Sequence, residues 1–229
     1  MLDAAPRLSS GRIAVRPIRG RDARALEREL NGNRSWLQRW EAQLPGIRPP
    51  SAFDGRGTVR GLLDGARAGT GMPFVIEVDG EFAGQLNVSS ITWGAVRGGM
   101  IGYWVAERFA GVGAATIATA LVTDYLLFEH GLHRLEICIR PENVPSLRVP
   151  EKLGFRYEGL RQRYIFIDGD WRDHLCFALV REELAEPLLQ RYLDGRVPEF
   201  DRSLYPVPIG EDFGAEAADE AGQRHPSAP

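Results

Sequence analysis

The stretch from Met100 to Phe155 decides the fold of this chain. It opens with Met-Ile-Gly-Tyr-Trp-Val, which predicts a strand over residues 100–105. The turn Arg-Phe-Ala-Gly-Val-Gly follows over residues 108–113, and an amphipathic helix is predicted from Gly113 to Phe128. The start of a helix carries free backbone N–H groups and about half a positive charge. Two glycines let an anion approach that backbone with no Cβ in the way, so this turn can cradle a phosphate.

The second half of the stretch predicts another strand and another helix. Leu135 to Arg140 alternates in the way a strand does. Asn143 and the proline two residues later suit the first turn of a helix that Gly154 ends. Pro150 lies inside this helix and is predicted to kink it. The order is therefore strand, glycine turn, helix, strand, turn, helix.

Further elements are predicted on both sides of this stretch. Helix caps, alternation and turn pairs indicate them. In chain order they are a strand Arg12–Ile18, helices Asp22–Leu30 and Ser35–Glu41, a loop Pro45–Gly57, a helix Thr58–Ala68, a hairpin of Phe74–Val78 and Glu81–Ile91 around Asp79-Gly80, a hairpin of Arg156–Ile167 and Trp171–Val180 around Asp168-Gly169, and a helix Glu182–Leu193.

Length and composition indicate a soluble globular domain. The chain has 229 residues, of which 44% are apolar and 26% charged, so it can bury a core without disulfides or metals. Residues 1–205 are predicted to form one domain. Residues 206–229 are acidic and rich in alanine and glycine, and they are predicted to be a disordered tail. The two cysteines, Cys138 and Cys176, lie in apolar strand-like runs, which favours buried thiols over a zinc site.

Charge and hydropathy limit the classes of binding partner that the sequence favours. The formal net charge of −3 gives no overall basic field for direct nucleic-acid binding. The N-terminus has no apolar signal region, and no apolar run reaches membrane-spanning length, so a cytoplasmic protein without a membrane partner is expected. The sequence is compatible with a monomer or a homodimer.

The glycine turn has several possible meanings when it is taken alone. A P-loop needs a lysine after its last glycine, and none follows Gly113. A dinucleotide fingerprint needs a third glycine where Thr116 stands. A plain structural turn remains the default for this motif in isolation.

The conjunction of motifs is more specific. Gly-Tyr-Trp-Val precedes Arg108-x-x-Gly-x-Gly, and Arg140-Pro-Glu-Asn-x-x-Ser and Lys152-Leu-Gly-Phe follow it. This pattern resembles the GNAT superfamily of N-acetyltransferases, and within it the RimJ/RimL branch of ribosomal-protein N-terminal-alanine acetyltransferases. The segment Phe-Ile-Asp-Gly-Asp-Trp-Arg-Asp-His-Leu from residue 166 adds to the likeness. The resemblance covers roughly residues 12–184.

The resemblance implies a fold and a donor site. The fold would be α/β, with a mixed, mostly antiparallel sheet that is splayed at its centre and covered by helices on both faces. Acetyl-CoA would be the co-substrate, no metal would be needed, and the CoA would lie where strands 100–105 and 135–140 part. The residues that the resemblance assigns to CoA are Val105, Arg108, Phe109, Ala110, Gly111, Val112, Gly113, Ala114, Asn143 and Ser146.

The implied reaction is direct attack of an amine on the thioester. The enzyme would be an acyltransferase for the α-amino group of a protein N-terminus, such as that of a ribosomal protein. A small-molecule amine as acceptor, or a CoA-binding sensor without catalysis, are the alternatives. We expect Ser146, assisted by Asn143, to act at the thiol end, although both residues also suit a plain helix start.

The base and the acceptor residues are less defined. Strand 100–105 has no acidic residue, and apolar residues near Ile165 replace the glutamate typical of the RimL type. Glu142, Asp173, His174 or a water relay remain as candidates for the base. The candidates for the acceptor groove are Trp36, Trp93 and Tyr103, together with Trp40, and some of these must instead be core residues.

Overall fold

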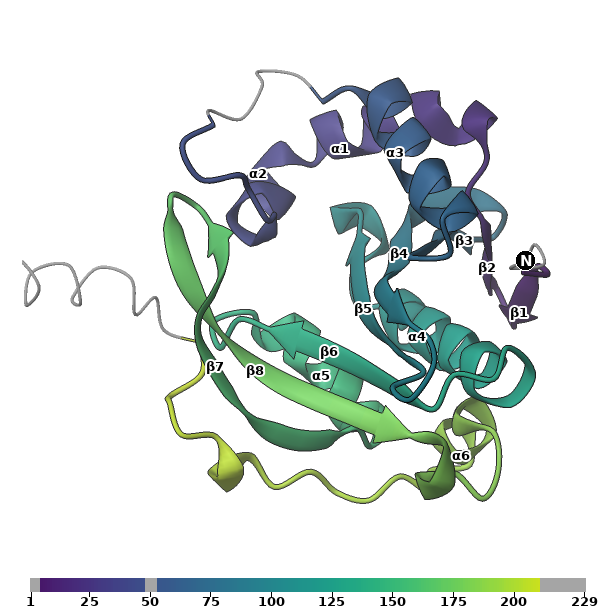
Figure 1. The fold of residues 1–229 in the computed structure, drawn as a ribbon, viewed down its shortest axis with the longest axis vertical. Coiled ribbons are helices and arrows are strands. Elements are labelled where there is room, and N and C mark those ends of the chain that lie inside the picture. The colour runs from purple at the N-terminus through teal and green to yellow at the C-terminus, as the bar shows by residue number, and fades with distance from the viewer. Residues whose placement is uncertain (1–4, 48–52, 211–229) are drawn as a thin grey trace, which may run out of the picture.

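The computed structural model describes residues 5–47 and 53–210 (Figure 1). Eight strands form one sheet in the order β1-β2-β3-β4-β5-β6-β8-β7. Every pairing between these strands is antiparallel except that of β5 with β6. The strands are β1 (Leu8–Ser10), β2 (Ile13–Pro17), β3 (Met72–Val78), β4 (Glu81–Thr92), β5 (Gly98–Val105), β6 (Arg134–Ile139), β7 (Arg156–Ile167) and β8 (Asp170–Val180).

The sheet opens at its centre. β5 and β6 are paired only from Gly98↔Arg134 to Met100↔Glu136, although both strands continue beyond this point. Figure 1 shows the two strands diverging toward their C-terminal ends. The expected splayed, mostly antiparallel sheet is thereby confirmed.

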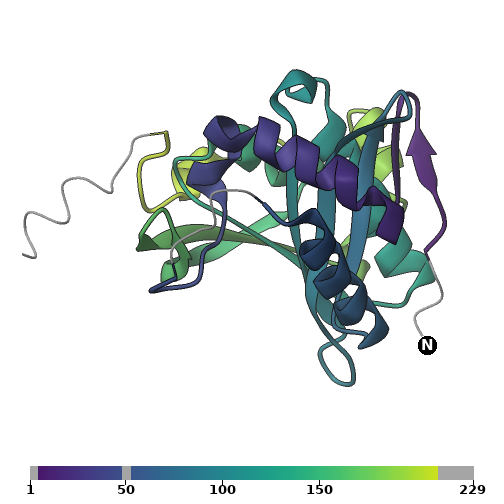
Figure 2. The same ribbon diagram turned by 90° about the horizontal axis from the view of Figure 1, so that it is seen from above.

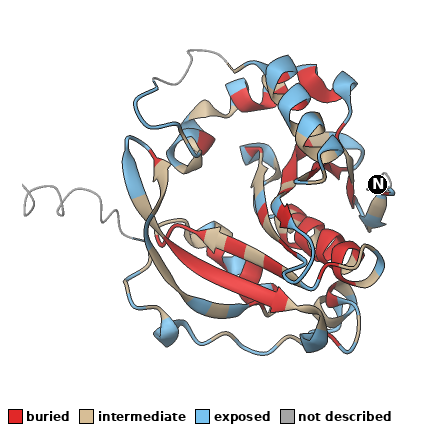
Figure 3. Ribbon diagram, viewed as in Figure 1, coloured by how far each residue is buried: buried red, intermediate tan, exposed pale blue. Residues whose placement is uncertain are grey.

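Helices cover both faces of the sheet. α1 (Ala23–Gly32) and α3 (Gly55–Arg67) lie across one side, as Figure 2 shows, and a small apolar core joins them to Val75 and Trp104. We call this side the α1 face. The other face carries α4 (Ala114–Asp124), α5 (Val144–Leu153) and α6 (Leu188–Leu193) over the main core. Figure 3 shows that buried residues concentrate in β3, β8 and α4.

Several boundaries differ from those predicted. α3 begins at Gly55 because the carboxylate of Asp54 accepts hydrogen bonds from the N–H groups of Arg56 and Gly57. The α-helical part of α4 ends at Asp124 and continues as a π-turn over Tyr125–Glu129. The C-terminal helix predicted from Glu182 is a 3₁₀ turn, Arg181–Glu183, followed by α6, since Pro187 interrupts it.

The folded domain reaches farther than residue 205. Val207 and Ile209 are partly buried against the main core, and the Gly210 N–H donates to the Pro141 carbonyl at 3.2 Å. We therefore propose that residues 206–210 belong to the domain. The predicted acidic tail from residue 211 onward lies outside the described residues.

Candidate active site

The glycine turn has the geometry of an anion cradle. Gly111 and Gly113 have φ values of 79° and 81°, in the left-handed region that favours glycine. A Cβ placed on either residue would meet no atom within 4 Å, so the space beside this backbone is open. Gly113 is the N-cap of α4, and the N–H groups of the first turn of α4 have no acceptor within the helix. The turn therefore fits the pyrophosphate of CoA.

Not all of the predicted cradle is available to a ligand. The N–H groups of Phe109 and Ala110 donate to the carbonyls of Ala106 and Glu107, each at 2.9 Å, within a 3₁₀ turn (Glu107–Phe109). The free donors are thus concentrated from Gly111 into the first turn of α4. Val112, within this part of the turn, is 42% exposed.

The side chain of Arg108 is committed to the fold. Its guanidinium pairs with the buried carboxylate of Glu29 on α1 and lies 4.5 Å above the ring of Phe109. Burial alone would raise the pKa of Glu29, but the hydrogen bond and charge of Arg108 hold that pKa below its usual value. Arg108 therefore connects the glycine turn to α1. Any anion at the turn would be bound by backbone N–H groups and not by the Arg108 side chain.

Residues 34–43 form a roof segment over the splayed strands. The indole Nε1 of Trp36, on α2 (Arg34–Leu37), donates to the carbonyl of Val105 at 3.2 Å, at the end of β5. Beyond α2, the 3₁₀ turn Gln38–Trp40 meets the end of β6, where Arg140 Nη1 donates to the Arg39 carbonyl at 2.9 Å. The roof segment thus spans from one splayed strand to the other.

The end of the roof segment joins the hairpin of β7 and β8. The N–H of Gln43 donates to the carbonyl of Phe166 at 2.8 Å, and Ala42 bridges to Ile167. Figure 1 shows α2 beside the tip of this hairpin. Trp40 lies with its ring 5.3 Å from the Arg140 guanidinium, so two of the predicted tryptophans stand at opposite edges of the splay.

Trp93 is not brought together with the other predicted acceptor residues. It lies in the turn before β5, is 41% exposed and packs its ring against His130. The splay is at the Val105 end of β5, so Trp93 is at the opposite end of the strand.

Ser146 and Tyr103 form a hydrogen-bonded pair on the α4–α5 face. Ser146 Oγ donates to Tyr103 Oη at 3.1 Å, and Tyr103 Oη donates to the Ser146 carbonyl at 3.1 Å. Burial raises the pKa of Tyr103, so its phenol stays protonated. Asn143 is the N-cap of α5, and its Oδ1 accepts from the Ser146 N–H at 3.3 Å.

Tyr103 was expected among the acceptor residues, and the structure places it beside the predicted thiol-end group instead. The signal for this was present in the sequence. Tyr103 has the same parity on β5 as Ile101 and Val105, which pack against the main core. Strand alternation therefore directs Tyr103 toward α5.

The α1 face of the splay holds His174. This residue is buried on β8, beside Leu175, which pairs with Ile139 at the end of β6. Leu175 belongs to the main core, so its neighbour His174 points to the opposite face. The Tyr164 ring lies edge-on to it at 5.7 Å, and Tyr164 Oη is 3.9 Å from Met100 Sδ, where the pairing of β5 with β6 ends.

His174 carries an available basic atom. Its Nδ1 lies 2.9 Å from the carbonyl of Arg172, which can only accept, so the proton of the neutral ring is on Nδ1 and Nε2 keeps its lone pair. Burial lowers the pKa of His174 and favours this neutral form. The other candidates are engaged. Glu142 pairs with Arg140 at 3.0 Å, and Asp173 accepts from the N–H of Arg163 at 2.7 Å.

The two thiols face one another across β6 and β8. Cys138 and Cys176 are register partners with their Sγ atoms 2.9 Å apart, and both are free cysteines in the structure. Within residues 5–47 and 53–210, no group of three or more His, Cys, Asp or Glu side chains is arranged to hold a metal ion. No helix in the same ranges is long and apolar enough to cross a membrane.

The family described as acetyltransferase (GNAT) domain matches residues 12–156. The chain therefore belongs to the GNAT acetyltransferases, and it is an acetyl-CoA-dependent N-acetyltransferase. It is similar in structure to Mycobacterium smegmatis RimJ in complex with CoA-disulfide, with a TM-score of 0.73 and 39% identity, covering 82% of this chain and 91% of that one.

Curated relatives agree with this assignment. The [ribosomal protein uS5]-alanine N-acetyltransferase of Escherichia coli is 29% identical over 177 residues, which are 76% of this chain and 90% of that protein. The probable N-acetyltransferase YjcK of Bacillus subtilis is 36% identical over 105 residues, and this match spans 46% of the chain and 58% of YjcK.

Proposed function

We propose that the acceptor is the N-terminal α-amino group of a protein, of the ribosomal-protein alanine type. The E. coli relative named for uS5 alanine supports this, because it aligns over 90% of its own length. The spermidine N(1)-acetyltransferase of E. coli is 31% identical over 114 residues, which span 61% of that protein, so a polyamine is the second candidate.

The charges around the splay favour a peptide over a polyamine. Three glutamates lie on β6, on the turn after β6 and on the roof segment, and each is paired with arginine. Glu136 pairs with Arg134 and Arg161, and Glu142 and Glu41 pair with Arg140 and Arg34. A polyamine brings several cations that need unpaired carboxylates, whereas a protein N-terminus brings one. This pairing is the observation that carries the proposal.

The mechanism follows from the two faces of the splay. Acetyl-CoA supplies the activated acetyl group, and the glycine turn holds its pyrophosphate. His174 Nε2, on the α1 face, takes the proton of the incoming ammonium, directly or through one water. Ser146 Oγ, on the α4–α5 face, gives a proton to the departing thiolate and recovers one from solvent. The roof segment confines the peptide between these groups.

The experiment is a comparison of kcat/KM across acceptors at fixed acetyl-CoA. Peptides beginning with alanine or serine are expected to react faster than spermidine, and the same peptides with blocked N-termini are expected to be inert. Faster turnover of spermidine would replace the proposal by the polyamine alternative. Binding of acetyl-CoA with no turnover of any acceptor would favour a sensor.

A further inference from the structure

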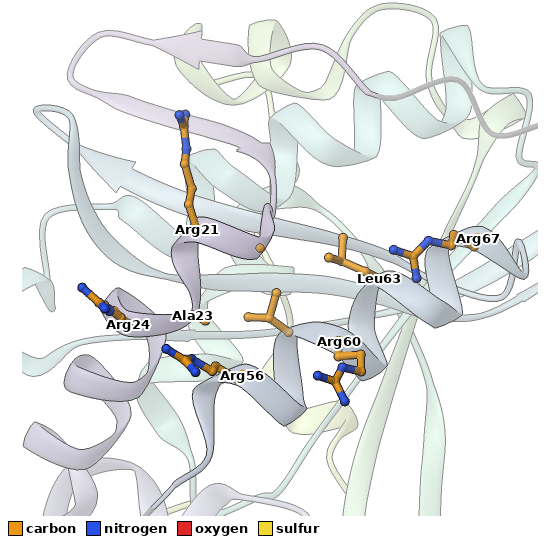
Figure 4. Close-up of a pocket in the computed structure, with 9 residues that line it drawn as sticks. Arg21, Ala23, Arg24, Arg56, Arg60, Leu63 and Arg67 are labelled. Atoms are coloured by element: carbon orange, nitrogen blue, oxygen red, sulfur yellow. The ribbon is translucent and has the colours of Figure 1, made fainter.

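A concavity of about 550 Å³ between the start of α1 and the length of α3 is lined by arginines. Figure 4 shows Arg21 and Arg24 around the start of α1 and Arg56, Arg60 and Arg67 along α3, with their side chains pointing in several directions. A second concavity shares two of these arginines and continues the surface along α1 to Arg28. We call the five arginines of the first concavity the arginine surface, and they are Arg21, Arg24, Arg56, Arg60 and Arg67.

Most of the arginine surface is not ion-paired, although Glu27 lines the second concavity together with Arg24 and Arg56. Arg67 pairs with Asp64, but in the part of the chain that the structure describes, the other four arginines have no carboxylate partner within 4.0 Å. Elsewhere, arginines beside buried acids are paired, as Arg16 is with Asp22 at 2.8 Å. The cluster stands out because the chain as a whole has a net charge of −3. Several cations that face one concavity repel each other unless an anion binds there.

The sequence of α3 is poorly suited to forming a helix by itself. Gly57, Gly61 and Gly65 lie in its interior, and glycine disfavours a helix by about 1 kcal/mol relative to alanine. Arg56 and Arg60 are also like charges four residues apart, which is a further destabilising arrangement. The packing of Val59 and its apolar neighbours must hold the helix. Arg56 and Arg60 therefore contribute nothing favourable to the fold that we can identify.

The geometry of the arginine surface suits a polymer of phosphates. At about 100° per residue, Arg56, Arg60 and Arg67 fall within roughly 40° of each other on α3. Their positions along the axis are separated by about 6 Å and about 10 Å, a row of about 16 Å that exceeds the length of one phosphate group. The remaining lining residues are glycine or small aliphatic side chains, so no aromatic ring is present on which a base could stack.

We propose that the arginine surface binds the phosphate backbone of RNA without reading its sequence. A nucleic-acid backbone carries one negative charge on every phosphate, so a row of arginines can pair with successive phosphates along its whole length. Arginine also forms bidentate hydrogen bonds to a phosphate group. An acidic polypeptide would need carboxylates at matching positions. The net charge of the chain gave no indication of this site, because it averages the arginines with acids elsewhere. The inference is independent of the acceptor that the enzyme acetylates.

The test measures binding of a fluorescein-labelled single-stranded RNA oligonucleotide to the full chain by anisotropy across a series of salt concentrations. Wild type is expected to bind with Kd of about 10⁻⁴ to 10⁻⁶ M at physiological salt, and log K is expected to fall linearly with log salt. For R56A/R60A, the loss of two contacts at about 0.7 each predicts a slope that is shallower by about 1.4. It also predicts roughly 25-fold weaker binding near 0.1 M salt. Alanine favours the helix, so this variant should keep its melting temperature and its acetyl-CoA turnover.

R148A is the matched control, because Arg148 is an exposed arginine on α5, which lies on the opposite face of the sheet from α3. It should bind the RNA as wild type does. Absence of RNA binding by wild type, or equal binding by R56A/R60A, would overturn the proposal. Displacement of the RNA by polyglutamate at the same charge concentration, or tighter binding to anionic lipid vesicles, would reassign the surface to those partners and also overturn it.

Discussion

Ser146 has two roles that the structure allows to be separated. Its N–H belongs to the start of α5, where Asn143 caps the helix, while its Oγ reaches Tyr103. The Ser146→Ala substitution removes only the second contact. If Ser146 protonates the thiolate, kcat should fall by about ten- to ten-thousand-fold. KM for acetyl-CoA should change little, since the glycine turn is untouched. Steady-state kinetics beside a thermal melt measures both effects.

Asn143→Ala is the control for the capping role. Loss of the cap should lower the free energy of unfolding by about 1 kcal/mol. A Ser146→Ala enzyme that keeps its kcat would remove Ser146 from the mechanism and leave it as part of the helix start.

His174 should govern the acid side of the pH profile. Burial lowers its pKa below the usual value of about 6.5, so kcat/KM should fall as the pH drops through that lowered pKa. The unfolded chain takes up this proton first, so the stability of the protein should also decline as the pH falls below about 6.5. His174→Gln should lose this limb of the kcat/KM profile. A profile of unchanged shape in the variant would exclude His174 as the base.

The glycine turn is the element that we propose binds the donor. Gly111→Glu places a bulky carboxylate where the pyrophosphate should lie and forces a non-glycine residue to φ of 79°. Calorimetry should show binding of acetyl-CoA weakened severely. Gly111→Ala should weaken it less, because it adds only the backbone strain and a Cβ that meets no protein atom within 4 Å. Equal affinity in wild type and Gly111→Glu would show that the anion binds elsewhere.

Elements with local signals were predictable, and contacts between distant elements were not. The glycine turn and the start of α5 are each encoded by consecutive residues, so their positions could be predicted from the sequence. The roof segment depends on Trp36 reaching Val105 and on Gln43 reaching Phe166, which are far apart in the chain. No local pattern encodes such pairs. Among the candidates for the base, His174 is the one we propose, because the hydrogen bond of its Nδ1 to the Arg172 carbonyl leaves Nε2 with its lone pair.

The limits of the folded domain can be tested on the whole molecule. A chain ending at Tyr205 lacks Val207 and Ile209, which pack partly against the main core. It should be less stable than a chain ending at Gly210 by about 1–3 kcal/mol, given the area that two partly buried aliphatic side chains remove from water. Denaturant unfolding of the two truncated chains measures the difference. Equal denaturation midpoints for the two truncated chains would place the end of the folded domain at residue 205.

For the whole molecule, the splayed sheet separates two tasks. We propose that the α4–α5 face, which carries the Ser146–Tyr103 pair, holds the donor, and that the α1 face, with its roof segment, receives the amine. The family pattern of motifs was sufficient to predict this sheet, because the motifs fix the glycine turn and the two strands that part beside it. On the side proposed for the acceptor, the pairing of Glu136 with Arg161 was not predictable, since only the fold brings these two distant residues together.

The most direct measurement uses one peptide that carries both an N-terminal alanine and an internal lysine. After incubation with acetyl-CoA and the enzyme, tandem mass spectrometry locates the acetyl group. The proposed acceptor predicts acetylation of the alanine α-amino group with the lysine unmodified. Acetylation of the lysine side chain would contradict it. When spermidine is added to the same mixture, acetylation of spermidine while the peptide stays unmodified would also contradict it.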